Sequence, residues 1–375
     1  QQSGAKTMTV PQAVRQTPLH GEHVALSARI VPFGGFDMPL QYAGILKEHD
    51  AVRHRAGLFD LSHMGQFLLR GPNVADWADR LTVNNVGTMK PYQARYNIFC
   101  NEHGGAHDDV IFYRLPENWL LVVNASNAEK MWAHLQEHLP ADGVSVENRH
   151  GQAALIAMQG PKSVELLRGV VHPDIAELKY YFCLEGTVYD KPAIIARTGY
   201  TGEDGFELFV DGADAPEIWK RLLEEKKSGG LEPAGLGARD VLRLEAGMPL
   251  YGHELTEEIG PLAAGLNWAV KLSKAEFLGK SALERQKADD AFPRIAGLVV
   301  DSKAPAREGY PVFADGTRVG EIRSGSIAPS LGGKNIATAL VDRDCATIGS
   351  ALQVEIRGTK YPAQVVAMPF YKRSE

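Results

Sequence analysis

The stretch HDDVIFYRLPENWLLVVN (residues 107–124) contains two apolar runs on either side of the turn residues Pro116-Glu117-Asn118. Runs rich in β-branched and aromatic residues around such a turn predict an antiparallel hairpin. In this hairpin Asp109 lies nearly opposite Asn124 at the open end. Because a slip of one residue reverses the face of every side chain, the sequence leaves open whether the two share a face.

Two adjacent aspartates, Asp108 and Asp109, stand at the start of the first run. Like charges so close raise each other's proton affinity, and burying either is costly unless donors or cations compensate. The pair is therefore either a solvated, turn-stabilising feature or part of a functional site. The pattern alone leaves both interpretations open.

The residues before the pair include His103 and His107, with Gly104-Gly105 between them. Two histidines four residues apart bind one metal only on a helix, and adjacent glycines disfavour a helix. The glycines instead predict a tight turn that lets the backbone approach a ligand. We therefore expect no metal site here.

Composition restricts the function classes. The 375 residues carry a formal net charge of −6, from 40 Lys and Arg against 46 Asp and Glu, and contain no basic run typical of nucleic-acid binding. No apolar run reaches the roughly 20 residues that span a bilayer. Cys100, Cys183 and Cys345 are far apart and odd in number, which favours buried thiols in a reducing compartment over disulfides. We expect neither a nucleic-acid nor a membrane partner.

Strand-like and helix-like runs alternate irregularly through the first 285 residues. Residues 128–139 have apolar side chains at helical spacing, with Ser126 or Asn127 available as an N-cap. Residues 237–247 predict a second helix that ends at Gly247. Because no regular strand-helix-strand rhythm is present, the pattern favours an α+β fold over a doubly wound parallel sheet.

Helix signals disappear after Arg294. Asp315-Gly316 and Gly358 each stand between two strand-like runs and predict tight hairpins. The last part of the chain is therefore expected to be a small all-β barrel or sandwich, joined to the rest by the polar stretch at 284–294.

The segment RTGYTGEDGFELFV (197–210) joins a glycine-rich turn to an apolar strand that contains Glu207. A carboxylate inside such a strand should face a cation, a donor or a ligand. Arg239 and Arg243 lie four apart on the second predicted helix, near Asp240 and Glu245. They form either internal ion pairs or a ligand clamp, and their spacing does not separate these alternatives.

Seven motifs stand in order along the chain: VPFGGFDMPLQY (31–42), RAGLFDLSHMGQ (55–66), NEHGGAHDD (101–109), RTGYTGEDGFEL (197–208), ARDVLRLEAGMPLYGHEL (238–255), FLGKSAL (277–283) and SGSIAPSLGGKNIA (324–337). Together they resemble the aminomethyltransferase, or T protein, of the glycine cleavage system, from about Thr17 to the C-terminus. The chain departs from the family pattern at Ala106-His107, where relatives usually have two apolar residues, and at Met248, where some have tyrosine.

This resemblance implies a three-domain α+β cloverleaf around a central folate channel, with an all-β C-terminal barrel or jelly-roll-like domain. The expected domains are residues 1–60 with 150–240, residues 61–149 with 241–285, and residues 286–375. The expected compartment is the cytoplasm in a bacterium or the mitochondrial matrix in a eukaryote.

The implied reaction moves a methylene carbon from the aminomethyl-lipoyl arm of H protein to N5 of tetrahydrofolate. It releases ammonia and gives 5,10-methylenetetrahydrofolate and dihydrolipoyl H protein. Tetrahydrofolate would be the co-substrate, lipoylated H protein the partner, and no metal would be needed.

Matched motif by motif, Asp109 resembles the family's catalytic carboxylate. Glu207 would accept hydrogen bonds from the amino-substituted edge of the pterin, and Arg239 would meet the anionic or carbonyl end of folate. The folate-contacting positions implied by the resemblance are Met64, Tyr96, Ile111, Asn124, Tyr200, Glu207 and Arg239.

Two related functions remain as alternatives. One is a folate-binding paralogue in iron–sulfur protein maturation. Those relatives carry a Lys-Gly-Cys-Tyr motif at the strand turn where this chain has Thr198-Gly199-Tyr200 and no cysteine. The other is a folate-dependent demethylase of a sulfur compound, which would share much of the fold.

Overall fold

The predicted hairpin lies inside a five-stranded sheet of the computed structural model, which describes residues 14–374. Its strands pair antiparallel with Ile111 opposite Val122, so the register carries Asp109 to Asn124, as predicted. In the order of the sheet, the strands are β6 (Ala94–Cys100), β7 (Ala106–Arg114), β8 (Trp119–Val123), β5 (Gly65–Arg70) and β9 (Ser145–Asn148).

Two helices, α3 (Val74–Leu81) and α4 (Ala128–Glu137), pack their apolar side chains into the core of this sheet. The second confirms the helix predicted at 128–139, with its end two residues earlier. Asn127 occupies the N-cap position, but its side chain makes no capping hydrogen bond and donates instead to Asp108. The side-chain amide is thus oriented by the buried carboxylate, to which its NH2 group donates, and its oxygen does not cap the helix.

A β-bulge interrupts the pairing of β6 with β7. Phe99 pairs with Asp108 and Cys100 with Ala106, so His107 is the extra residue. The predicted tight turn at Gly104-Gly105 precedes it. A Cβ on Gly105 would lie 1.7 Å from the Glu257 carbonyl oxygen. The close approach that the glycine allows is therefore to the protein's own backbone, and the predicted approach to a ligand is wrong for this residue.

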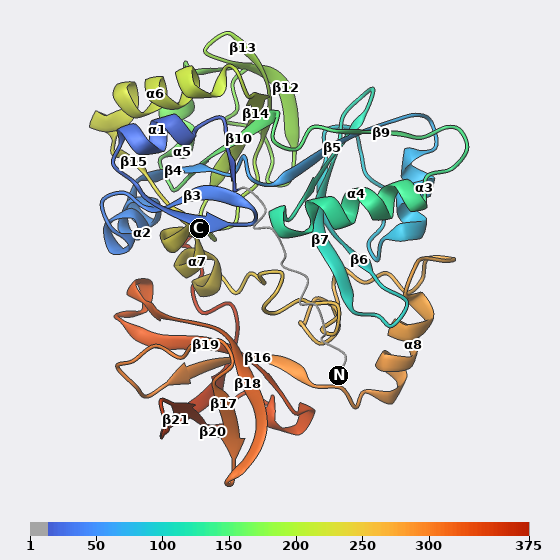
Figure 1. Ribbon diagram of the computed structural model, residues 1–375, viewed down its shortest axis with the longest axis vertical. Coiled ribbons are helices and arrows are strands. Elements are labelled where there is room, and N and C mark those ends of the chain that lie inside the picture. Colours follow the sequence, from blue (N-terminus) through green and yellow to red (C-terminus); the bar gives the residue numbers. More distant parts are fainter. Residues whose placement is uncertain (1–13, 375) are drawn as a thin grey trace, which may run out of the picture.

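A seven-stranded sheet forms the core of a second group of elements. Its strand order is β11 (Val171–His172), β12 (Cys183–Val188), β13 (Lys191–Ala196), β14 (Gly205–Asp211), β10 (Ala153–Gln159), β4 (Ala56–Asp60) and β15 (Leu231–Pro233). Only the β4–β15 pair is parallel. The fully buried Trp219 is the largest side chain of the core. The helices near this sheet are α1 (His20–Ala25), α2 (Ile45–His54), α5 (Ser163–Leu167) and α6 (Ala215–Lys226) (Figure 1).

A small three-stranded sheet lies beside this group, in the order β1 (Arg15–Gln16), β3 (Phe36–Gln41) and β2 (Arg29–Phe33). Helix α7 (Leu236–Glu245) confirms the second predicted helix, and Gly247 follows it with a positive φ of 66°, as a C′ glycine should. In Figure 1 this helix lies between the seven-stranded sheet and the C-terminal strands.

The C-terminal strands close into a six-stranded barrel, which decides between the barrel and the sandwich. Asp315-Gly316 and Arg357-Gly358 each have two positive φ angles, the conformation of a tight two-residue hairpin loop. The order around the barrel is β16 (Arg294–Val300), β19 (Lys334–Val341), β18 (Thr317–Ala328), β17 (Pro311–Ala314), β20 (Ala351–Ile356) and β21 (Thr359–Val366).

The polar stretch at 284–294, expected to be a linker, is mostly helical, because α8 spans Lys280–Asp289. The buried side chains of Ala282 and Leu283 anchor this helix to the rest of the protein. The helix was not predicted because the residues around these two are polar. Figure 1 shows three lobes: the barrel, the seven-stranded sheet with its helices, and the five-stranded sheet with α3 and α4.

The predicted α+β class and all-β C-terminal barrel are confirmed. The exact division into two interleaved domains and a barrel remains a proposal, and residues 1–13 of its first domain lie outside the described residues. Between residues 14 and 374, no helix is long and apolar enough to cross a membrane.

Candidate active site

A cavity of about 280 Å³ lies where β7 and β8 meet α7 and the loop between β13 and β14. Every site residue that the sequence predicted contributes to its wall, although they come from six separate parts of the chain. These residues are Met64, Tyr96, Asp109, Ile111, Asn124, Tyr200, Glu207 and Arg239.

Asp109 lies at the end of the hairpin and faces Asn124. The Asn124 side-chain amide donates to the Asp109 carboxylate at 2.8 Å and to its backbone oxygen at 3.0 Å, so the two residues do share a face. The hydroxyl of Tyr96 donates to the other carboxylate oxygen at 3.0 Å. These donors hold the carboxylate in one orientation at the cavity wall.

Asp108 points away from the cavity and is fully buried. Its carboxylate accepts hydrogen bonds from the side-chain amides of Asn124 at 2.8 Å and Asn127 at 2.7 Å, and from the Asn124 backbone N–H at 3.1 Å. Burial raises the pKa of both aspartates, and the charge of Asp109 raises that of Asp108 further. Asp108 is therefore not a solvated turn acid, and Asp109 lies at the cavity wall.

Glu207 lies on β14 and is 7% exposed. One of its carboxylate oxygens accepts hydrogen bonds from the Tyr113 hydroxyl at 2.9 Å and from the Thr198 hydroxyl. The other oxygen has no hydrogen-bond partner within residues 14–374, and the residue lines the cavity. This oxygen is therefore available to accept a hydrogen bond from a ligand.

The two arginines on α7 have different surroundings. Arg243 is 1% exposed and pairs with Asp240 at 2.8 Å and Glu254 at 3.1 Å, so it forms the internal ion pairs. Arg239 has no ion pair in the described part of the chain, and its guanidinium lies 4.4 Å from the centre of the Tyr200 ring. Burial lowers the pKa of Arg239. An unpaired guanidinium at a cavity wall is a position for an anionic or carbonyl group.

A second cavity of about 380 Å³ adjoins the first and shares part of its wall with it. His63 lines this second cavity, and its buried Nδ1 has no hydrogen-bond partner among the described residues. Burial lowers the pKa of His63 to about 3, so its imidazole is neutral. The residues common to both cavities are Met64, Asn124, Tyr200, Arg239 and Leu250.

Several residues of the site were not predicted. Tyr113 and Thr198 orient Glu207, and Asn127 holds Asp108. Tyr113 could have been found, because it follows Asp109 and Ile111 at the strand spacing of two. Trp268, whose ring centre lies 5.6 Å from that of Tyr96, had no sequence signal.

His103 and His107 do not form a pair. His103 is exposed beside Glu102, whereas His107 lies 3.4 Å from Glu257 and packs on His134 with ring centres 4.7 Å apart. In the part of the chain that the structure describes, no group of three or more His, Cys, Asp or Glu side chains could hold a metal ion. The three cysteines are free thiols.

Comparison with known proteins gives one family over nearly the whole chain. The model of the GCVT N-terminal domain matches residues 19–274, and that of the glycine cleavage T-protein C-terminal barrel domain matches residues 294–372. The aminomethyltransferase of Moorella thermoacetica is 45% identical over 361 residues, 96% of this chain and 98% of that protein. That of Rubrobacter xylanophilus is 47% identical, over 96% of this chain and 95% of that protein.

A solved structure agrees. The glycine cleavage system aminomethyltransferase T from Bartonella henselae superposes with a TM-score of 0.90 and 33% identity, over 96% of this chain and 98% of that one. Sequence motifs, cavity and whole-chain similarity therefore lead to one conclusion. The chain belongs to the aminomethyltransferase (T protein) family of the glycine cleavage system.

Proposed function

We propose that this transferase uses tetrahydrofolate as the acceptor and the aminomethyl-lipoyl arm of H protein as the donor. The observation that supports this most strongly is the convergence of all eight predicted residues on one cavity. Within that cavity, Glu207 offers an open carboxylate oxygen and Arg239 an unpaired guanidinium. A folate has complementary groups, with amino and N–H donors at its pterin edge and carbonyl and carboxylate acceptors elsewhere.

In this proposal the pterin lies with its amino-substituted edge against Glu207. A carboxylate that accepts hydrogen bonds from such an edge fixes the plane of the ring. Tyr200 provides a flat apolar wall, and Arg239 binds a carbonyl or carboxylate of the same ligand. Orientation of this kind is the main contribution that the chain makes when two reactants must meet.

Asp109 then acts on the reacting groups. The methylene carbon loses its bonds to sulfur and to the amino nitrogen and gains bonds to N5 and N10 of the folate, and the protons of N5 and N10 leave with the thiol and ammonia. A carboxylate beside the reacting nitrogen can orient it, carry a proton and stabilise positive charge that develops at carbon. Its raised pKa brings it closer to working pH, which suits proton transfer.

The adjoining second cavity supports a site for two ligands, because it provides space next to Asn124 and Tyr200 that one ring system in the first cavity would not fill. Lipoylated H protein is accordingly the proposed partner, with no metal required. The proposed compartment is the cytoplasm if the source is bacterial and the mitochondrial matrix if it is eukaryotic.

The test mixes the protein with tetrahydrofolate and aminomethylated H protein and measures ammonia and methylenetetrahydrofolate. We expect turnover by the wild type and its loss in Asp109→Ala, with the fold retained. The matched control is Asp344→Ala, which removes a 93% exposed aspartate from the barrel. No ammonia above background from the wild type would refute the proposed reaction and favour a folate-binding paralogue. Near-normal turnover by Asp109→Ala would refute only the role of that residue.

A further inference from the structure

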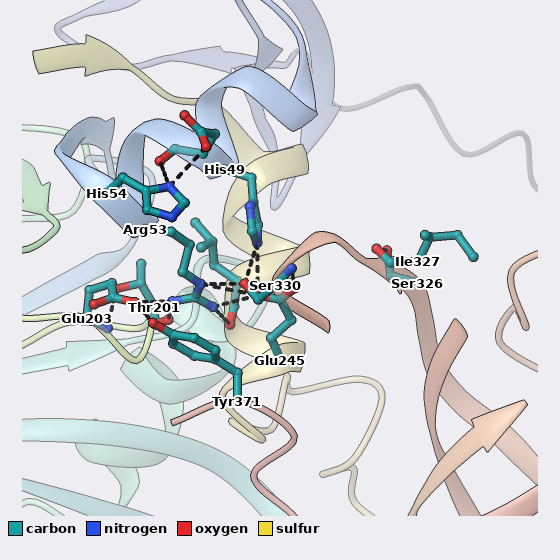
Figure 2. A network of polar contacts seen from close by, with 12 residues as sticks. His49, Arg53, His54, Thr201, Glu203, Glu245, Ser326, Ile327, Ser330 and Tyr371 are labelled. Atoms are coloured by element: carbon teal, nitrogen blue, oxygen red, sulfur yellow. Dashed lines mark hydrogen bonds and ion pairs between the residues drawn. The ribbon is translucent and has the colours of Figure 1, made fainter. Parts of the chain in front are cut away.

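A buried polar network lies behind the cavity wall and is centred on Arg53, at the end of α2. The Arg53 side chain is 3% exposed and connects elements that are far apart in sequence. Figure 2 shows it between Glu245 of α7 and the loop residues Thr201 and Glu203, with the ring of Tyr371 beside its guanidinium. A buried charge with this many partners is strongly restricted in position.

One side of the guanidinium holds the loop between β13 and β14. Arg53 Nη1 donates to the Thr201 backbone oxygen at 2.6 Å and to the Glu203 carboxylate at 2.8 Å. Thr201 directly follows Tyr200, so the first of these bonds fixes the peptide next to the aromatic wall of the cavity. The Tyr371 hydroxyl donates to the same Glu203 oxygen at 2.8 Å.

The other side holds α7. Arg53 Nη2 donates to the Glu245 carboxylate at 2.7 Å and to the Leu242 backbone oxygen at 3.3 Å. Leu242 lies three residues, about one helical turn, after Arg239, so this contact fixes the helix that carries the unpaired guanidinium. Arg53 therefore bonds to both elements whose side chains, Tyr200 and Arg239, stack 4.4 Å apart at the cavity wall.

We propose that Arg53 is a positioning residue of the transferase, which keeps Tyr200 and Arg239 stacked at the cavity wall by tying the 199–204 loop to α7. Arg53 does not line either cavity that the wall residues share. Its effect on substrate therefore passes through Tyr200 and Arg239. The inference rests on the proposed function, because it takes tetrahydrofolate as the ligand of this wall.

A lysine at position 53 keeps the charge but has one donor group in place of the planar fork, so it cannot bind the loop and the helix together. We expect Arg53→Lys to fold and to weaken tetrahydrofolate binding by five- to twentyfold in calorimetry at 25 °C. KM for tetrahydrofolate should rise by a similar factor, with kcat changed less than threefold.

His49→Gln is the matched control. His49 donates to the same Glu245 carboxylate at 2.8 Å but, within residues 14–374, has no hydrogen bond to the loop. We expect this variant to lose stability while its Kd for tetrahydrofolate stays within twofold of the wild type. Arg53→Lys and His49→Gln should therefore separate in affinity even where their melting temperatures fall together.

The decisive measurement is a double-mutant cycle with Tyr200→Ala. If Arg53 acts through Tyr200 and its stack, Arg53→Lys should weaken binding less than twofold further once Tyr200 is removed. Equal weakening in both backgrounds, or an unchanged Kd in the single variant, would overturn the proposal.

If Arg53→Lys does not fold, Glu203→Gln tests the same link from the loop side. We expect this variant to bind tetrahydrofolate two- to fivefold more weakly than the wild type, and wild-type affinity would contradict the proposal. Failure of the wild type to bind tetrahydrofolate would refute the proposed function instead.

Discussion

Asn124→Ala is the sharpest test of how the carboxylate pair is tuned. The Asn124 amide nitrogen lies 2.8 Å from a carboxylate oxygen of Asp108, 2.8 Å from one of Asp109 and 3.0 Å from the Asp109 backbone oxygen. It carries two hydrogens, so three acceptors share two donors. Removing it leaves Asp109 with the Tyr96 hydroxyl as its remaining side-chain donor among the described residues.

The expected size follows from the bond that Asp109 loses. A hydrogen bond to a charged group contributes about 1.5–3 kcal/mol, and one pKa unit corresponds to about 1.36 kcal/mol. Because the bond favours the ionised form, its loss should raise the pKa of the ionisation that activity requires by roughly 1–2 units at most, since the simultaneous loss of the Asn124 bond to Asp108 favours protonated Asp108 and acts in the opposite direction. Burial already raises this pKa, so the acid limb of kcat/KM should move further up by about that amount.

Asn127→Ala is the matched control, because among the described residues its side-chain amide donates to Asp108 alone, at 2.7 Å. Losing that bond favours protonated Asp108, which removes a negative charge beside Asp109 and eases its ionisation. The acid limb should stay in place or move to lower pH. The assay is the pH dependence of ammonia release between pH 5 and 9. The reasoning is refuted if the Asn124→Ala profile superimposes on that of the wild type, or if both variants move in the same direction by the same amount.

Three further predictions follow from other contacts. Glu207→Gln should weaken tetrahydrofolate binding by about 10–100-fold, the equivalent of one charge-assisted hydrogen bond, and calorimetry showing a change below threefold would contradict this. Burial raises the pKa of Glu245, but hydrogen bonds from His49 and Arg53 outweigh it and lower it to about 2. The lowered pKa stabilises the fold by about 3 kcal/mol at most. This stabilisation should be complete above the unfolded pKa near 4.3 and should be lost as the pH falls toward 2. Between pH 6 and 3, the urea midpoint of Glu245→Gln should therefore change less with pH than that of the wild type. Gly105→Ala should reduce both stability and turnover, because its Cβ would collide with the Glu257 carbonyl, whereas Gly21→Ala, with no atom within 4 Å, should melt like the wild type.

The hairpin and its register could be predicted because local patterns determine them. Alternating apolar residues and a short turn bring Asp109 opposite Asn124 without help from the rest of the chain. The barrel hairpins were predictable for the same reason, since a two-residue loop with positive φ angles has a strong residue preference. Where a few neighbouring residues decide the geometry, sequence reasoning was sufficient.

Contacts between distant segments were beyond such reasoning. Tyr113 and Glu207 are 94 residues apart. No periodicity in the sequence shows that the Tyr113 hydroxyl donates to one carboxylate oxygen of Glu207 and leaves the second oxygen open. The different surroundings of Arg239 and Arg243 likewise depend on where Glu254 lies. The helical spacing of the two arginines gives no information about the position of Glu254. The residues of the site were found by resemblance, whereas their free and occupied atoms required the structure.

The bulge at His107 explains how the chain accommodates a histidine in the strand that carries Asp109. In an unbroken strand, side chains 107, 109 and 111 would share one face, and the imidazole would lie beside Asp109 in the cavity. The extra residue instead turns His107 toward α4, where its ring packs on His134, and it also lies 3.4 Å from Glu257 of the segment that follows Leu255. Burial lowers the pKa of His107, so the ring is mainly neutral at pH 7. The bulge thus determines which side chains face the cavity, and the pKa of Asp109 is set by its burial and by the donors Tyr96 and Asn124 rather than by an imidazole.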